Sequence, residues 1–340
     1  MKPPAFWAGS TGPGSRLAQA LLSPLSAIQA AATAQRVAKP GARVDAAVLC
    51  VGNLSVGGTG KTPVAAAAMD RLADRDVAVH GLSRGYGGRL KGPERVDPEL
   101  HGPDDTGDEP LLLARHASVW VSRDRVAGAL RAVENGADAI VMDDGFQNPS
   151  LHKDASIIVI DGEAGWGNGR VFPAGPLREP VEAGLRRADA VVVMMPGPED
   201  IPNFEALGLA DLEKPVLRAW LEPAEPPPPG ALVAFAGIGR PEKFFDAIRR
   251  QGGDVVETVA FPDHHRFSAR ELERLADLAS GANGTLVTTE KDAVRLQAGF
   301  RETVFVSRVD ARFADARALD AILQAGLDAA AARGVKAAAR

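Results

Sequence analysis

Short apolar runs alternate with helix-like stretches along most of the chain. Runs of this length, rich in valine, isoleucine, leucine and alanine, predict buried strands. They are the segments 46–52, 77–83, 118–122, 137–143, 156–161 and 190–195. The stretches at 63–74, 109–115 and 124–135 separate some of them and predict helices. Because strands that are apolar on both faces need cover on both sides, the alternation predicts a three-layer α/β/α domain with a mostly parallel sheet over 44–222.

The same alternation restarts after a proline-rich stretch. Residues 223–230, with the sequence PAEPPPPG, predict a linker. Four further apolar runs separated by two helical patterns follow it, and they predict a second, smaller α/β domain over 231–335. The alanine-rich part from about residue 318 is expected to form a surface helix that frays.

The first 43 residues carry only positive charge. They hold five basic residues and no acidic one, although the whole chain has a net charge of −5. These basic residues are Lys2, Arg16, Arg36, Lys39 and Arg43. The uncharged run between Arg16 and Arg36 contains several polar residues, so it is too polar for a membrane span. It predicts one or two short amphipathic helices, with Pro24 kinking or starting a helix. Such a segment can lie in the interface of an anionic membrane, and packing on the protein's own core is an equally open interpretation.

Composition and charge exclude several classes of protein. The 340 residues are 45% hydrophobic and 24% charged, which is ordinary globular usage and excludes a disordered or fibrous chain. A single cysteine, Cys50, excludes a disulfide framework and any cysteine-based zinc or iron–sulfur site. The sequence after Met1 lacks the apolar run of a secretory signal, so none is expected. The body of the chain is acidic, so nucleic acid is not an expected partner, and no obligate protein partner is evident.

A glycine-rich loop between a predicted strand and a predicted helix gives the first chemical indication. The segment SVGGTGKT is typical of a P-loop, whose backbone N–H groups cradle phosphate oxygens, except that its first position is serine instead of glycine. Its predicted nucleotide-binding residues are Ser55, Val56, Gly57, Gly58, Thr59, Gly60, Lys61 and Thr62. Lys61 is expected to reach the β- and γ-phosphates, and the Thr62 hydroxyl to bind Mg²⁺. ATP and Mg²⁺ are therefore the expected cofactors, and an ordinary strand–helix loop is the alternative.

Two adjacent carboxylates end a predicted strand. Asp143 and Asp144 follow the apolar run AIVM, and the carboxyl ends of strands face the ligand crevice of an open α/β sheet. With a P-loop in the same chain, these carboxylates are predicted to bind the metal. The alternative is a helix cap.

Six ordered segments together resemble the tetraacyldisaccharide 4′-kinase family. They are VGNLSVGGTGKTP, SRGYGG (83–88), TGDEP (106–110), DDGFQ (143–147), GNGRVFPAGPLREP (167–180) and TTEKD (288–292). The resemblance implies that ATP phosphorylates the 4′-hydroxyl of lipid A disaccharide 1-phosphate, giving lipid IVA. It also implies a peripheral location at the cytoplasmic face of the bacterial inner membrane, since PAFW and LLSPLSAI are similar to the family's membrane-associated N-terminal helix. Asn148 departs from the family, which usually has histidine there.

The resemblance also implies roles for individual residues. Asp108 of TGDEP matches the catalytic base and His264 its partner from the second domain, while Lys61 acts on the phosphates. The positions that match the lining of the active-site cleft are Arg84, Tyr86, Gln147, Arg178 and Glu179. Without the resemblance, Asp108 could simply cap the predicted helix at 109–115, and a loop histidine such as His264 is more often solvated than catalytic.

Three further side chains are interpreted without help from the resemblance. Arg125 is expected either to clamp a phosphate in the cleft or to pair with Asp124. Lys291 and Asp292 are interpreted as a structural ion pair near the domain boundary, with no role in the chemistry.

Two other function classes compete with a kinase. A membrane-attached ATPase switch of the partitioning type also has a GGxGKT loop and an amphipathic helix. Such proteins carry a signature lysine where this chain has Val56, which argues against that class. A lipid-binding module with a vestigial P-loop is disfavoured because Lys61, Thr62, Asp143 and Asp144 are all present.

Overall fold

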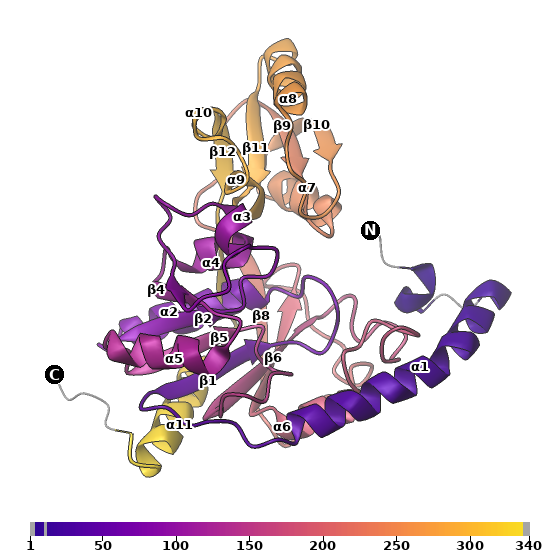
Figure 1. Ribbon diagram of the computed structural model, residues 1–340. Coiled ribbons are helices and arrows are strands. Elements are labelled where there is room, and N and C mark those ends of the chain that lie inside the picture. The colour runs from indigo at the N-terminus through magenta and orange to yellow at the C-terminus, as the bar shows by residue number, and fades with distance from the viewer. Residues whose placement is uncertain (1–3, 10–11, 336–340) are drawn as a thin grey trace.

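The computed structural model describes residues 4–9 and 12–335, and Lys2 of the basic N-terminal segment lies outside them. In this part of the chain, nine strands form one large sheet in the order β13-β8-β7-β6-β1-β5-β2-β4-β3 (Figure 1). The strands from β8 to β4 in this order pair in parallel, and the edge strands β3 and β13 are antiparallel to their neighbours. The bounds are β1 Ala47–Gly52, β2 Val79–Ser83, β3 Glu94–Arg95, β4 Ser118–Val121, β5 Ala139–Asp143, β6 Ala155–Asp161, β7 Ala190–Met195, β8 Val216–Pro223 and β13 Val309–Phe313.

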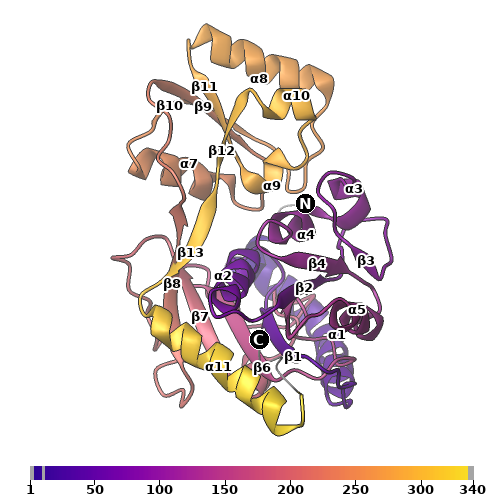
Figure 2. The same ribbon diagram turned by 90° about the vertical axis from the view of Figure 1, so that its left-hand side faces the viewer.

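Helices cover both faces of the large sheet. Helices α2 (Lys61–Ala73), α4 (Asp108–Leu113) and α11 (Ala316–Ala332) pack on one face (Figure 2), and α5 (Arg125–Glu134) and α6 (Val181–Arg187) pack on the other (Figure 1). Strand β1 shows why the sequence requires this. Its residues Leu49 and Val51 join one apolar core, while Val48 and Cys50 join the other, so neither face can be left to water. The predicted three-layer α/β/α architecture is confirmed.

A smaller α/β unit projects from one end of this domain. Its parallel sheet has the order β10-β9-β11-β12, with α8 on one face and α7 on the other (Figure 1). The remaining short helices are η1 and α3 in the first part of the chain and α9 and α10 in the smaller unit. The bounds are β9 Ala231–Ala236, α7 Pro241–Arg250, β10 Asp254–Ala260, α8 Ala269–Gly281, β11 Thr285–Thr289, α9 Glu290–Ala293, α10 Ala298–Arg301, β12 Val304–Ser307, η1 Ala5–Ala8 and α3 Pro103–Thr106.

The chain returns to the large domain after β12, so the predicted boundary of 231–335 is wrong. Strand β13 pairs with β8 of the large sheet, and α11 packs on β1, β6 and α2. The alanine-rich C-terminal helix is therefore not a fraying surface helix, because Leu319 and Leu323 are almost fully buried. Only Arg308 separates β12 from β13, so the sequence carries no turn signal where the chain leaves the smaller unit.

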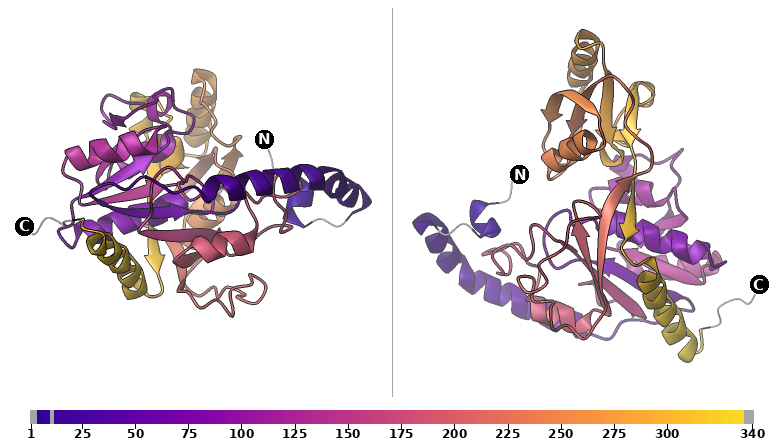
Figure 3. Two further views of the ribbon diagram at one scale, coloured as in Figure 1. Left: turned by 60° about the horizontal axis from the view of Figure 1, so that its bottom comes forward. Right: turned by 180° about the vertical axis from the view of Figure 1, so that it is seen from behind.

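Helix α1 (Pro13–Val37) is one continuous helix, whereas one or two short helices were predicted. It runs along the edge of the large domain and extends beyond it at its N-terminal end (Figure 3). Pro24 lies inside the helix, where it cannot donate the usual backbone hydrogen bond. The hydroxyls of Ser23 and Ser26, which flank Pro24, donate to the carbonyls of Gln19 and Leu22 in the preceding turn.

The packing of α11 gives a testable prediction. A Cβ atom on Gly326 would lie 2.3 Å from Leu49 Cδ2 and 3.0 Å from the Cβ of Ala155, so no larger side chain fits without displacement. We expect Gly326→Leu to reduce the free energy of unfolding by about 1–3 kcal/mol, as measured by denaturant titration. Gly299→Leu is the control, because its Cβ would meet nothing within 4 Å. Equal stability of the two variants would contradict the docking of α11.

Candidate active site

The glycine-rich loop joins β1 to α2 at the carboxyl end of the central strand. Gly57 and Gly60 have φ angles of 128° and 87°, which residues with a side chain rarely adopt. Gly60 directly precedes α2, so the first N–H groups of that helix point into the loop. Asn53 Nδ2 braces the loop by donating to the Gly57 carbonyl at 3.4 Å and to Thr59 Oγ1 at 3.3 Å. The predicted P-loop residues therefore form one turn that ends at the N-terminus of α2.

The two predicted metal-binding carboxylates lie beside this turn. The Thr62 hydroxyl donates to Asp143 Oδ2 at 3.1 Å, and Lys61 Nζ lies 3.9 Å from Asp144 Oδ1. Burial raises the pKa of Asp143 to about 7, although Lys61 opposes this. Burial also acts to raise the pKa of Asp144, but Lys61 and Arg178 outweigh it and the pKa is lowered. Neither carboxylate caps a helix, because the chain passes from β5 through turns to β6.

Asp143 Oδ1 identifies where a cation fits. This oxygen is buried and has no hydrogen-bond partner among the described residues, although buried carboxylate oxygens are normally satisfied. A hydroxyl and two carboxylates next to a phosphate turn are the oxygen ligands that Mg²⁺ prefers. The residues present therefore fit a magnesium ion.

The burial of Asp143 leads to a stability prediction for the metal-free protein. Its pKa rises from 3.8 to about 7 on folding, so between these values the folded state holds a proton that the unfolded state has lost. The contribution of Asp143 to the free energy of unfolding therefore falls as the pH rises from about 4 to about 7. We expect Asp143→Asn to raise the free energy of unfolding by about 1–3 kcal/mol at pH 8 without Mg²⁺, and clearly less at pH 5. Thermal unfolding at both pH values tests this, and a gain independent of pH would contradict it.

A polar network beneath the loop connects three of the residues expected to line the cleft. Arg178 donates to both oxygens of Asp144, at 2.7 and 3.1 Å, and Nη1 lies 3.4 Å from Gln147 Oε1. Gln147 Nε2 in turn donates to the Asn53 carbonyl at 2.8 Å and to Glu179 at 3.0 Å. Gln147 and Glu179 are buried, so they do not line the cleft themselves. Gln147 instead contacts Arg178 and the Asn53 carbonyl at the start of the P-loop. Sequence reasoning missed Arg187, whose two 2.9 Å bonds hold Glu179.

Arg125 is a buried cation without a carboxylate partner among the described residues. Only 3% of its surface is exposed, Nη1 donates to the Ser122 carbonyl, and Nε has no partner in the part of the chain that the structure describes. Asp124 does not pair with it, because the Asp124 side chain caps α5 instead. Burial, together with the nearby Arg84, lowers the pKa of Arg125 to about 10. A buried guanidinium without an ion pair among the described residues is suited to bind an anion. Tyr86, in contrast, is 74% exposed on the loop after β2.

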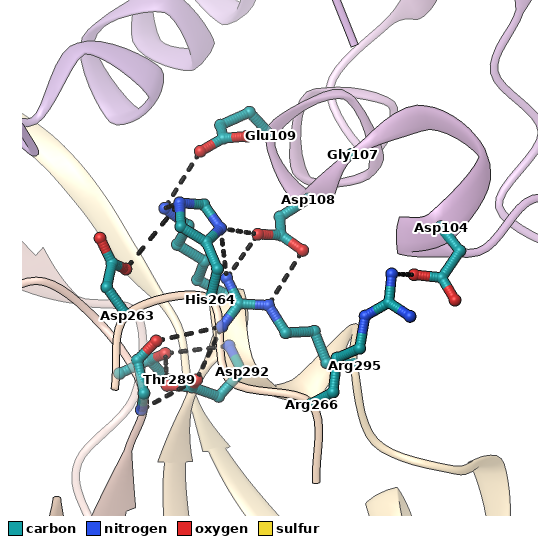
Figure 4. Close-up of polar contacts among 12 residues, drawn as sticks. Asp104, Gly107, Asp108, Glu109, Asp263, His264, Arg266, Thr289, Asp292 and Arg295 are labelled. Carbon is teal, nitrogen blue, oxygen red and sulfur yellow. Dashed lines mark hydrogen bonds and ion pairs between the residues drawn. The ribbon is translucent and has the colours of Figure 1, made fainter. Parts of the chain in front are cut away.

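Asp108 and His264 meet across the junction of the two units (Figure 4). Asp108 is the first residue of α4, and His264 lies in the loop after β10 with its Nδ1 atom 2.8 Å from Asp108 Oδ2. Asp108 does not cap α4, whose N-cap is Gly107. Burial acts to raise the pKa of Asp108, but hydrogen bonds from His264 and Arg295 outweigh it and lower the pKa to about 2. Arg295 was not predicted from the sequence, although it stands four residues after Lys291 of TTEKD.

Lys291 does not form the predicted ion pair with Asp292. Its ammonium lies 3.0 Å from Glu109 Oε1 and 3.4 Å from His264 Nε2, whereas Asp292 pairs with Arg295. The ligand atoms of Asp108, Glu109 and His264 lie within 4.8 Å of one another, as they would around a metal ion. The cations of Lys291 and Arg295 already neutralise these carboxylates, so a second metal is not needed there.

Comparison with known proteins places this geometry in a family. A model of the tetraacyldisaccharide-1-P 4′-kinase family matches residues 18–328. The chain belongs to the tetraacyldisaccharide 4′-kinase family. It is 55% identical to the tetraacyldisaccharide 4′-kinase of Maricaulis maris over 97% of each chain. It is 49% identical to that of Caulobacter vibrioides over 94% of this chain and 97% of the other.

A solved structure supports the same assignment. The crystal structure of LpxK from Aquifex aeolicus in complex with ATP has a TM-score of 0.72 to this chain, with 29% identity over 91% of this chain and 99% of the other. The predicted family and P-loop kinase fold are confirmed, and so is the prediction of an ATP-dependent lipid A 4′-kinase. An ATPase switch of the partitioning type is not favoured.

Proposed function

We propose that the chain transfers the γ-phosphoryl group of ATP, with Mg²⁺, to the 4′-hydroxyl of tetraacyldisaccharide 1-phosphate at a membrane surface. One observation carries the proposal. The P-loop turn and the Asp108–His264 pair lie at the same side of the large domain. Their closeness is reflected in the pKa of Asp143, which is raised mainly by burial, then by Asp144, and then by Glu109, the neighbour of Asp108. A phosphate site next to a carboxylate–histidine pair is the arrangement that phosphorylation of a hydroxyl requires.

The magnesium ion would be held by Thr62, Asp143 and Asp144. The Oδ1 atom of Asp143, which has no hydrogen-bond partner within the described part of the chain, supports this set. When bound, such an ion neutralises charge on the β- and γ-phosphates. The chain's own residues supply the remaining functions.

One group of residues binds the phosphates, and another removes the proton of the acceptor hydroxyl. Lys61 and the N–H groups of the P-loop hold the phosphates, while the buried Arg125 offers a further positive charge to an anion beside them. The Asp108–His264 pair removes the proton of the acceptor hydroxyl as the oxygen attacks. Arg178 holds Asp144 in place with two hydrogen bonds.

An assay with γ-labelled ATP and purified tetraacyldisaccharide 1-phosphate tests the proposal. We expect label on the lipid, dependent on both the protein and a divalent cation. The disaccharide that already carries a 4′-phosphate is the matched negative control, because its acceptor position is blocked. Release of inorganic phosphate without labelled lipid, from protein that binds ATP, would contradict the proposal.

Helix α1 supports a peripheral membrane location, which we propose to be the cytoplasmic face of the inner membrane. Its buried positions are small or polar, and Ser26 accepts a 3.0 Å hydrogen bond from the Ala174 N–H. Four of its large apolar side chains are exposed. They are Leu17, Leu21, Leu25 and Ile28, each between 54% and 69% exposed. None of the helices in the described residues is both long and apolar enough to cross a bilayer.

The apolar stripe of α1 predicts the outcome of a vesicle-binding experiment. The triple variant Leu17→Ser, Leu21→Ser, Ile28→Ser should bind anionic vesicles at least about tenfold more weakly, because the apolar area available to the acyl region is lost. Leu100→Ser is the control, since Leu100 is 77% exposed on a loop outside α1. Flotation with vesicles of anionic and neutral lipid measures the effect. Unchanged binding of the triple variant would contradict the role of α1.

A further inference from the structure

The loop 167–177, with the sequence GNGRVFPAGPL, lies directly against the P-loop. Val56 donates its N–H to the Pro176 carbonyl at 2.8 Å, and Ser55 forms an antiparallel β-bridge with Leu177. Since the N–H groups of a P-loop must point at phosphate oxygens, a shift of this contact displaces the phosphate site. The loop 167–177 therefore supports the P-loop.

Few other contacts support this side of the P-loop within the described part of the chain. A Cβ atom on Gly57 or Gly58 would meet nothing within 4 Å, and the Val56 side chain is 48% exposed. The Gly57 carbonyl accepts a 3.4 Å hydrogen bond from Asn53, which is longer than the usual range of about 2.7–3.2 Å. The position of Val56 and Gly57 therefore depends on the loop 167–177.

Asn168 connects the same loop to the start of the chain. Its N–H donates to the Trp7 carbonyl at 2.8 Å, and its Nδ2 atom donates to the Phe6 carbonyl at 2.9 Å. Nδ2 also donates to the Ala174 carbonyl at 2.8 Å, while Oδ1 accepts the Arg170 N–H at 3.0 Å. One residue thus joins η1 to two further points of the loop.

Trp7 and α1 contact the loop as well. The Trp7 Nε1 atom donates to the Pro173 carbonyl at 3.1 Å, and the indole ring meets Phe172 edge-on, with the ring centroids 5.9 Å apart. On α1, Ser23 Oγ accepts a 3.1 Å hydrogen bond from Arg170 Nη1. Since η1 lies beside α1 (Figure 1), both helices hold the loop together.

The short helix η1 can leave this position at little cost. None of its residues Ala5–Ala8 is buried, and it is only four residues long. Segments with little buried surface open locally with small free energies. This helix is therefore an element with two states, one docked on the loop 167–177 and one detached from it.

We infer that Asn168 is a positioning residue that couples the docking of η1 to the P-loop, so that the start of the chain raises the affinity for ATP. This deepens the proposed function and rests on its nucleotide site. With η1 docked, Asn168 holds the loop 167–177 where it supports Val56. With η1 detached, Asn168 loses two hydrogen bonds, and the P-loop N–H groups are held less firmly around the phosphates. Because coupling between two sites is reciprocal, bound ATP must stabilise docked η1 by the same factor.

Hydrogen exchange of the full chain with and without Mg-ATP tests this reciprocity. Saturating ATP should slow the exchange of the backbone amides of Ala5–Ala8 at least about fivefold. Asn168→Ala saturated with ATP should lose this slowing, because the connection between the two sites is broken. If Asn168 stabilised only its own loop, ATP would not affect η1 in either protein. Unchanged exchange at Ala5–Ala8 in the ATP-saturated chain overturns the inference, and so does slowing that persists in Asn168→Ala.

A variant at the start of the chain tests the coupling from the other direction. Trp7→Ala removes the hydrogen bond to Pro173 and the ring contact with Phe172, both of which lie in the loop 167–177. We expect the Kd for ATP, measured by titration without lipid, to rise at least about fivefold, and Trp7→Phe to give a smaller increase because it keeps an aromatic ring. The double variant Trp7→Ala, Asn168→Ala should bind ATP no more weakly than Asn168→Ala, since both act through one loop. Unchanged ATP affinity in Trp7→Ala contradicts the coupling.

Two controls distinguish this coupling from a general loss of structure or of lipid binding. Asn135→Ala makes the same chemical change as Asn168→Ala at the C-cap of α5, and it should leave the Kd for ATP within about twofold. The triple variant Leu17→Ser, Leu21→Ser, Ile28→Ser removes exposed side chains of α1, and it should weaken vesicle binding without changing the Kd for ATP. An equal loss of ATP affinity in the triple variant would refute the inference, because the contacts of the loop are still present there.

The kinase assay separates this inference from the proposed function. The unaltered protein must bind ATP and label the lipid. If it does neither, the proposed function fails and the inference fails with it. If it does both and Trp7→Ala keeps its ATP affinity, only the inference fails.

Discussion

Asp108→Asn is expected to lower kcat by about 10²–10⁴-fold while leaving the Kd for ATP nearly unchanged. The asparagine side chain keeps one acceptor oxygen, but it carries no charge to balance Arg295 or to stabilise a protonated His264. Loss of a helix cap cannot account for such an effect, because Gly107 is the N-cap of α4. Steady-state kinetics at saturating ATP and lipid, with nucleotide titration, measure the two quantities.

The neighbouring Asp104 provides the control for this prediction. Asp104→Asn makes the same chemical change on α3, in an exposed pair with Arg266, and should leave kcat within about twofold. The double variant Asp108→Asn, His264→Ala should be little worse than the more damaged single variant, because the two residues act as one unit. Fully additive losses would show that they act separately. An unaltered kcat in Asp108→Asn would exclude Asp108 from the chemistry.

Lys61→Ala should reduce kcat by about 10²-fold or more, since it removes the cation over the phosphates while the backbone turn stays in place. The same variant frees Asp144 from its 3.9 Å contact, but the bidentate pair with Arg178 remains. The fold is therefore expected to survive, as circular dichroism and thermal unfolding can verify. Lys91→Ala, at an exposed position on the loop after β2, is the control. Near-normal turnover of Lys61→Ala would show that this loop does not hold the transferred phosphate.

The sequence predicts those features that depend on local patterns. The apolar runs identify the strands because a strand buried on both faces, such as β1, must be apolar along its length. The P-loop is recognisable because Gly57 and Gly60 are needed for its backbone angles. Asp143 is recognisable because it is the last residue of an apolar strand, and ligands bind at the carboxyl ends of the strands in such a sheet.

Features that depend on distant partners could not be predicted. Arg295 meets Asp108 across 187 positions in the sequence, and nothing next to either residue indicates the other. The same holds for α11. Its alanine-rich sequence is typical of a surface helix, and only the structure shows that Gly326 packs against Leu49. Pro24 suggested an interruption of α1. A proline at an exposed helical position leaves only one carbonyl without its usual helical partner, and the helix continues.

The return of the chain after β12 also affects how the protein is synthesised. Strand β1 is made early, but the helix that covers Leu49 on one face lies at Ala316–Ala332. Domains that fold during translation do so when their last core element has left the ribosome. Here the smaller unit, whose strands all lie between Ala231 and Ser307, can fold first, while the part of the large sheet around Leu49 that α11 covers is still exposed. During that interval the exposed apolar surface around Leu49 is of the kind that chaperones bind.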